Sequence, residues 1–123
     1  TQNYDANLST IFFEDLELLP ADHVLEYERG TPMSELGSIL TKIEKLIISE
    51  DPDCFLILGD TNSCLSAIVA KKHRVPVFHI EAGNRCFDQN VPEEINRKVI
   101  DHISDLNIVY SNFAKENLIN EIK

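Results

Sequence analysis

Phe55-Leu56-Ile57-Leu58-Gly59-Asp60-Thr61-Asn62-Ser63 is the stretch that decides the fold. The apolar run over residues 54–58 is continuous, which is typical of a parallel strand buried on both faces. A second stretch, Val77-Phe78-His79-Ile80-Glu81-Ala82-Gly83, has the same plan: a short apolar strand stops at a carboxylate near a glycine. We therefore expect two strands with an acidic residue at the carboxyl end of each.

Helix and strand patterns alternate on both sides of these stretches. Thr31 followed by Pro32 is a helix-start pattern, and Ser111 is placed to cap the last helix. Alternation of this kind predicts a single α/β domain over residues 1–123, with a parallel, Rossmann-like sheet. The expected helices cover residues 7–16, 31–49, 62–72 and 92–103 and begin again near 112; the expected strands cover 54–58, 77–80 and 106–110, with a weaker one at 23–27.

Composition narrows the class of protein. The chain has 123 residues and a formal net charge of −10. This charge argues against non-specific binding to nucleic acid or to an anionic membrane, and no apolar run reaches the roughly 18 residues of a membrane span. Cys54, Cys64 and Cys86 lack metal-ligand spacing. We interpret them as reduced thiols of a cytoplasmic protein, with Cys54 in the core.

Three acidic residues are expected on one rim of the sheet. Asp60 and Glu81 end two strands, and Glu93 opens the helix of Pro92-Glu93-Glu94-Ile95-Asn96-Arg97. Ligands of open parallel sheets bind just beyond the carboxyl ends of the strands. Proton transfer at a weakly acidic carbon needs carboxylates whose environments tune them for it. The pattern therefore indicates a site that moves protons or handles a charged substrate.

Each carboxylate also has a purely structural alternative. Asp60 is placed to cap the following helix. A glutamate directly after a buried strand needs a partner, and Arg85 is the candidate for Glu81. Glu93 is favoured by the helix dipole and is spaced to pair with Arg97 at i,i+4.

The histidines and the basic cluster have alternatives too. His79 is either a core histidine bonded to a backbone carbonyl or a substrate contact, and His102 is expected to be structural. The cations at 71–74 end a helix and complement its dipole, with phosphate binding as the other interpretation.

At these residues the chain closely resembles the non-hydrolysing UDP-N-acetylglucosamine 2-epimerase family, over essentially its whole length. That resemblance implies a two-domain, glycosyltransferase-B-like fold with the active site between the domains. This chain would be most of the N-terminal domain, an excerpt of a longer protein. The matching segments, in the family's order, are Thr1-Gln2-Asn3-Tyr4-Asp5, Gly59-Asp60-Thr61-Asn62-Ser63, His79-Ile80-Glu81-Ala82-Gly83 and Pro92-Glu93-Glu94-Ile95-Asn96-Arg97.

The resemblance also implies a reaction. The family epimerises C2 of a UDP-linked 2-acetamido sugar: the C2 proton is removed, UDP leaves by anti elimination to give a 2-acetamidoglycal, and UDP re-adds after reprotonation on the other face. The resemblance implies that the reaction needs neither a metal nor a nicotinamide. It also implies that the protein is a homodimer, as is typical of the family. The family's catalytic carboxylates fall on Asp60, Glu81 and Glu93. Substrate-binding positions fall on Gln2, His79, Arg85, Asn96 and Arg97.

One departure bears on the substrate. Residues 84–88, Asn-Arg-Cys-Phe-Asp, resemble the branch that forms UDP-N-acetyl-L-fucosamine from a 2,6-dideoxy-L-talose precursor, rather than typical N-acetylglucosamine enzymes; both serve surface-polysaccharide synthesis. Two other interpretations stay open: an inactive remnant that acts only as a folded module, and half of a nucleotide-sugar glycosyltransferase.

Overall fold

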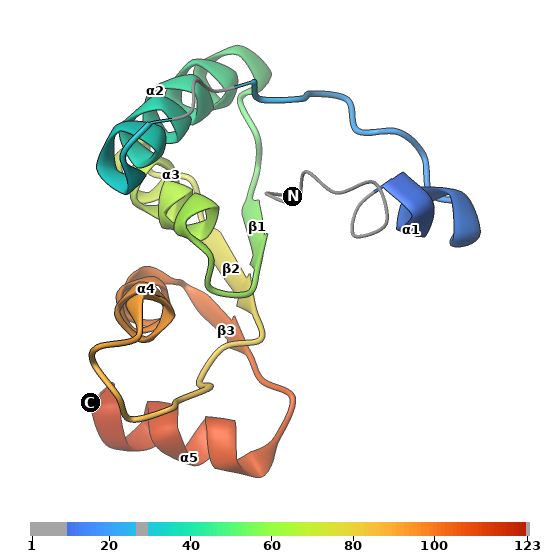
Figure 1. Cartoon of the computed structure of the whole chain (residues 1–123). Coiled ribbons are helices and arrows are strands. Elements are labelled where there is room, and N and C mark those ends of the chain that lie inside the picture. The colour runs from blue at the N-terminus through green and yellow to red at the C-terminus, as the bar shows by residue number, and fades with distance from the viewer. Residues whose placement is uncertain (1–9, 27–29, 123) are drawn as a thin grey trace.

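The computed structural model describes residues 10–26 and 30–122, and Figure 1 shows how they are arranged. Helices and parallel strands alternate, so the predicted α/β class is confirmed. In chain order the elements are α1 (Thr10–Asp15), α2 (Pro32–Glu50), β1 (Phe55–Leu58), the 3₁₀ helix η2 (Asn62–Ser66), α3 (Ala67–Lys72), β2 (Val77–Ile80), α4 (Pro92–Ile103), β3 (Leu106–Ile108) and α5 (Asn112–Glu121).

The sheet has the order β1-β2-β3, and both neighbouring pairs are parallel. Helices α2, α3 and α4 lie on one side of it (Figure 1). The core forms between these helices and the inward residues of the strands, where Ile57, Val77 and Ile100 are buried. This layer positions the carboxyl ends of all three strands at one edge.

The other face of the sheet is largely bare in the described part of the chain. The register places Leu56 beside Phe78 and Leu58 beside Ile80, and Leu56 and Leu58 are 60% and 61% exposed. Phe13, Ala21 and residues 23–25 line part of a groove of about 430 Å³ over β1, but they leave these leucines more than half exposed. The expectation that this strand is buried on both faces is therefore wrong for the described residues, because helices cover only one face.

The predicted caps and two element ranges are confirmed. Thr31 Oγ1 accepts a hydrogen bond from Ser34 N at 3.3 Å, and Ser111 Oγ accepts one from Ala114 N at 3.1 Å. The ranges 77–80 and 92–103 agree with the predictions. No helix in the described ranges combines the length and apolarity that a membrane span requires.

Other boundaries differ from the predictions. The helix expected over 62–72 begins as a 3₁₀ turn, where Thr61 Oγ1 and Ser63 Oγ lie 2.9 Å apart. Residues 23–26 are not a strand, since their backbone pairs with no described strand, and residue 27 lies outside the described ranges. The first helix is described only from Thr10 to Asp15, and residues 7–9 lie outside.

The cysteines are all free thiols, but their burial differs from the prediction. Cys54 is exposed, so its assignment to the core is wrong. Cys64 is buried, and its Sγ lies 3.3 Å from Leu58 O. Cys54 precedes the first paired residue of β1, which explains why it escapes the core.

Candidate functional site

Asp60 and Glu81 come directly after neighbouring strand ends. Gly59 N donates to Ile80 O at 3.1 Å, so the strands remain paired up to the two acidic residues. A Cβ on Gly59 would lie 3.7 Å from Glu81 Oε2, and Gly59 has a φ of +82°. The Glu81 carboxylate therefore extends over the glycine that precedes Asp60. Both acidic residues are half-buried on the same rim.

Glu81 is held in an unusual backbone conformation. Its φ is +74°, in the left-handed region that a residue with a side chain rarely adopts. Such a conformation costs about 1–3 kcal/mol and persists only where the surroundings impose it. Here the N–H groups of Glu81 and Ala82 both donate to Ile108 O at 3.1 Å. The turn thus aims the Glu81 side chain by means of a constraint from β3.

The partner predicted for Glu81 is wrong. Its Oε1 accepts one long hydrogen bond, from Asn84 Nδ2 at 3.3 Å. Arg85 binds other carboxylates, as described below. Among the described residues, Glu81 has no ion-pair partner.

Asp60 is held by α4 and does not cap the next helix. Its Oδ2 accepts from Arg97 Nε at 3.0 Å and Arg97 Nη2 at 2.6 Å, and its backbone carbonyl accepts from Asn96 Nδ2 at 2.9 Å. Thr61 occupies the cap position of the 3₁₀ helix, without a side-chain cap bond. Helix α4 therefore orients Asp60 through two consecutive side chains.

The adjacent glutamates of α4 have different environments. Glu94 is completely buried, and its carboxylate accepts hydrogen bonds from Cys86 N at 3.1 Å, Phe87 N at 3.2 Å and Arg97 Nη1 at 2.9 Å. Burial by itself raises the pKa of Glu94, but these donors outweigh it and lower the pKa. Glu93 is half-buried and forms no ion pair with a described residue. The predicted Glu93–Arg97 pair is wrong, because Arg97 binds Glu94 and Asp60 instead.

Arg97 joins the two carboxylates it contacts. Burial lowers the pKa of its guanidinium, whereas the hydrogen bond and charge of Asp60 and the charge of Glu94 raise it, and the net direction is upward. Arg97 therefore stays cationic and links α4 to the rim. Its side chain remains 15% exposed.

His79 belongs to the core, as one of the two interpretations holds. Its side chain is completely buried, with Nδ1 2.8 Å from Asp101 Oδ1 and Nε2 2.9 Å from Gly59 O. Both ring nitrogens are therefore already bonded inside the protein, and a direct substrate contact by His79 stays a prediction.

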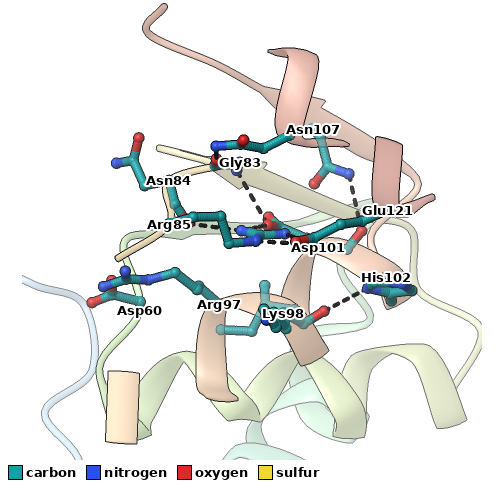
Figure 2. A network of polar contacts seen from close by, with 12 residues as sticks. Asp60, Gly83, Asn84, Arg85, Arg97, Lys98, Asp101, His102, Asn107 and Glu121 are labelled. Carbon is teal, nitrogen blue, oxygen red and sulfur yellow. Dashed lines mark hydrogen bonds and ion pairs between the residues drawn. The ribbon is translucent and has the colours of Figure 1, made fainter. Parts of the chain in front are cut away.

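The Arg85 side chain is also buried, and Figure 2 shows it pointing toward Asp101. Its Nη1 donates to Asp101 Oδ2 at 2.7 Å, and its Nε and Nη2 donate to Glu121 Oε2 at 2.9 and 2.6 Å. Burial alone would lower the pKa of the guanidinium, but Glu121 and Asp101 raise it overall. The side chain has no exposed surface, and a direct substrate contact by Arg85 stays a prediction.

Asn96 and Gln2 are the other two residues predicted to bind substrate. Asn96 is buried, and its amide nitrogen donates to Asp60 O and to Asn62 Oδ1 at 3.0 Å. Asn96 therefore links α4 to the backbone of Asp60 and to the side chain of Asn62. Gln2 lies outside the described residues.

The remaining polar residues of interest are structural. Lys71 pairs with Asp105 at 2.7 Å and His73 with Glu44 at 3.0 Å, so these members of the basic cluster bind acidic side chains of the same chain. His102 Nδ1 lies 2.8 Å from Lys98 O within α4. No group of three or more His, Cys, Asp or Glu in the described ranges is arranged to hold a metal ion.

Sequence reasoning missed the roles of Glu94 and Asp101. A usable signal existed, because Glu94, Arg97 and Asp101 are spaced i, i+3 and i+7 and thus share one face of a helix.

Three surface pockets of the described residues are lined by residues other than Asp60, Glu81 and Glu93. The single cleft predicted for Asp60, Glu81 and Glu93 therefore stays a prediction.

A parallel α/β sheet with acidic residues beyond two strand ends is typical of proteins that bind a ligand at the sheet's carboxyl edge. The sequence model of the family described as UDP-N-acetylglucosamine 2-epimerase matches residues 1–123. The chain belongs to this family.

Relatives and solved structures agree with this assignment. A Pseudomonas aeruginosa UDP-2,3-diacetamido-2,3-dideoxy-D-glucuronate 2-epimerase is 45% identical over 98% of the chain and 34% of its own length. The structure of UDP-N-acetylglucosamine 2-epimerase from Rickettsia bellii is 50% identical with a TM-score of 0.86, covering 98% of this chain and 32% of that one. The Methanocaldococcus jannaschii enzyme in complex with UDP-GlcNAc and UDP is 43% identical with a TM-score of 0.93, covering 98% and 34%. The chain spans about a third of the length of the curated relatives it matches.

Proposed function

We propose that this chain is most of the N-terminal domain of a two-domain enzyme that epimerises C2 of a UDP-linked 2-acetamido sugar. The observation that carries the proposal is Glu81, held at φ +74° beyond β2 with its carboxylate over Gly59, next to Asp60. Backbone strain of this kind is concentrated at functional sites. The Glu81 carboxylate has no ion-pair partner among the described residues, and it lies beside Asp60, which Arg97 holds in place.

The chemistry needs proton transfer on both faces of the sugar at C2. In the proposed reaction a carboxylate takes the C2 proton while the C1–O bond to UDP breaks, which leaves a 2-acetamidoglycal and UDP. Return of a proton to the opposite face of C2, with re-formation of the C1–O bond, gives the epimer. Asp60, Glu81 and Glu93 are the groups proposed to move these protons.

Three observations support this assignment. Asp60 and Glu81 follow paired strands, and α4, which carries Glu93 in its first turn, also supplies the residues that hold Asp60. Glu93 is half-buried without an ion pair to a described residue, whereas its neighbour Glu94 is occupied in holding a loop. The M. jannaschii relative, solved with UDP-GlcNAc and UDP, has the same fold over this segment.

The sugar itself has more than one candidate. The P. aeruginosa relative, at 45% identity, is named for a diacetamido-glucuronate, and the M. jannaschii relative, at 44%, for N-acetylglucosamine. Residues 84–88 differ from typical N-acetylglucosamine enzymes and resemble the branch that makes UDP-N-acetyl-L-fucosamine. Glu94 holds their backbone at Cys86 and Phe87, and Phe87 is 74% exposed. This segment, which is exposed at residues 86–88 and close to Glu93 in the chain, is the proposed determinant of the sugar.

The test is C2 deuterium incorporation by the full-length protein that contains this chain. We would incubate it in deuterated water with UDP-N-acetylglucosamine, UDP-2,3-diacetamido-2,3-dideoxy-D-glucuronate and UDP-2-acetamido-2,6-dideoxy-L-talose, each in turn. Deuterium at C2 of one of them, with formation of its epimer, is the expected result. Absence of exchange with all three, from a protein that is folded and binds UDP, contradicts the proposal.

A further inference from the structure

Asp101 lies at the centre of a buried polar network behind the candidate site. It projects from α4 and is only 1% exposed. Its carboxylate accepts from His79 Nδ1 at 2.8 Å, Gly83 N at 3.2 Å and Arg85 Nη1 at 2.7 Å. Figure 2 shows the bonds from Gly83 and Arg85 converging on it. A buried carboxylate with several donors is costly to disturb, because each donor it loses becomes unpaired.

The partners of Asp101 lie on both sides of Glu81. His79 precedes Glu81 by two residues and Gly83 follows it by two. The strained turn is therefore fixed at both ends by one side chain of α4. Gly83 is fixed further, because its carbonyl accepts from Asn117 Nδ2 at 2.9 Å and a Cβ there would lie 2.2 Å from Ala114 O.

The same network reaches Asp60 through His79. The imidazole Nε2 lies 2.9 Å from Gly59 O, and Gly59 directly precedes Asp60. Since Nδ1 of the same ring lies 2.8 Å from Asp101 Oδ1, the imidazole bridges Asp101 and the strand end that precedes Asp60. Arg85, which also contacts Asp101, pairs with Glu121 as well.

We infer that Asp101 is a positioning residue that sets where Glu81 and Asp60 stand relative to each other. It fixes the Glu81 turn directly and the Asp60 strand end through His79, without itself reaching the rim. The inference rests on the proposed function, since it assigns Asp101 to the geometry of that reaction. Small displacements of reacting groups are expensive: a shift of about 1 Å can lower a rate about 100-fold.

The experiment compares Asp101→Asn with Asp105→Asn in the full-length protein. Asp105 is a matched control, because it also accepts from a backbone N–H, that of Val77 at 2.8 Å, and from a cation, Lys71, but at the opposite end of the sheet. For Asp101→Asn we expect kcat for C2 deuterium exchange to fall about 10- to 100-fold, with KM within about threefold. For Asp105→Asn we expect kcat within about twofold of the unaltered protein. A purely structural role would lower the folded fraction and leave kcat per folded molecule unchanged.

A second measurement makes the inference independent of the substrate. Amide hydrogen exchange at Ala82 and Gly59 should accelerate in Asp101→Asn and not in Asp105→Asn, because both amides lie in segments that Asp101 holds. If Asp101→Asn does not fold, Asp101→Glu keeps the charge while displacing it, and the same two readouts apply. No exchange activity with any sugar in the unaltered protein would refute the proposed function and leave the amide test to decide on Asp101. Unchanged amide exchange, or unchanged kcat in an active enzyme, overturns the inference.

Discussion

Glu93 and Glu94 are neighbours in sequence, and we predict that neutralising each has a different consequence. Glu94→Gln should destabilise the fold, whereas Glu93→Gln should leave stability nearly unchanged and abolish most of the activity. The same chemical change is made at adjacent positions of one helix turn. Helix propensity and local charge therefore change almost equally, and the difference reports the environment of each side chain.

The magnitude for Glu94 follows from its contacts. The carboxylate accepts from two backbone N–H groups and from Arg97, at 2.9–3.2 Å, in a completely buried position. Hydrogen bonds to a charged group contribute about 1.5–3 kcal/mol each, and an amide retains only one acceptor oxygen. Losing one or two of these bonds predicts a decrease in unfolding free energy of about 2–4 kcal/mol.

The assay is urea unfolding of the full-length protein, followed by far-ultraviolet circular dichroism, alongside C2 deuterium exchange. For Glu93→Gln we expect an unfolding free energy within about 0.5 kcal/mol of the unaltered protein, and exchange about 10²- to 10⁴-fold slower. The reasoning is refuted if Glu94→Gln costs less than about 0.5 kcal/mol, or if Glu93→Gln destabilises the protein as much as Glu94→Gln does.

Three further outcomes are expected. The folded-state pKa of Glu94 is lowered, so its ionised carboxylate stabilises the fold above the unfolded pKa of about 4.3, and this stabilisation is lost as pH falls through the folded pKa. The difference in unfolding free energy between the unaltered protein and Glu94→Gln, from urea midpoints at several pH values, should therefore narrow below about pH 4. A difference that widens there would contradict the contacts. Gly83 has φ +79° and a Cβ there would lie 2.2 Å from Ala114 O, so Gly83→Ala should lower the unfolding free energy by about 2 kcal/mol or more. Gly37 lies in α2 with nothing within 4 Å of an added Cβ, so Gly37→Ala should raise the unfolding free energy by about 0.5–1 kcal/mol. Thermal unfolding of both variants tests this, and shifts of the same sign would refute the comparison. The 123-residue chain alone should give no C2 deuterium exchange, and exchange above a no-protein control would contradict this. It should also self-associate through Leu56, Leu58 and their neighbours on the bare sheet face, which a monodisperse monomer in sedimentation velocity would contradict.

The elements were predictable where local chemistry determines them. Pro92 favours the start of α4 through its fixed φ, whereas Thr31 and Ser111 cap their helices by accepting backbone N–H bonds, and the structure has all three features. The parallel α/β class followed from alternation alone. The prediction that the strand over residues 54–58 is buried on both faces was wrong, because the covering of a sheet depends on elements distant in sequence.

The partners of charged residues were the least predictable part of the site. Local spacing suggested Glu93 for Arg97 and Arg85 for Glu81, yet both arginines bind carboxylates brought together by the fold, at Asp60, Asp101 and Glu121. Buried charges pair where desolvation would otherwise be uncompensated, and tertiary contacts decide which pair forms. The strained φ of Glu81 had no counterpart in the sequence pattern either.

The central claim is that Asp60 and Glu81 move protons at C2 of a UDP-linked sugar. It is tested most directly by C2 deuterium exchange in the full-length protein and in its Asp60→Asn and Glu81→Gln variants, with folding checked by circular dichroism. We predict folded variants whose exchange is slower by about 10²- to 10⁴-fold. Exchange at nearly the unaltered rate in both variants would contradict the account.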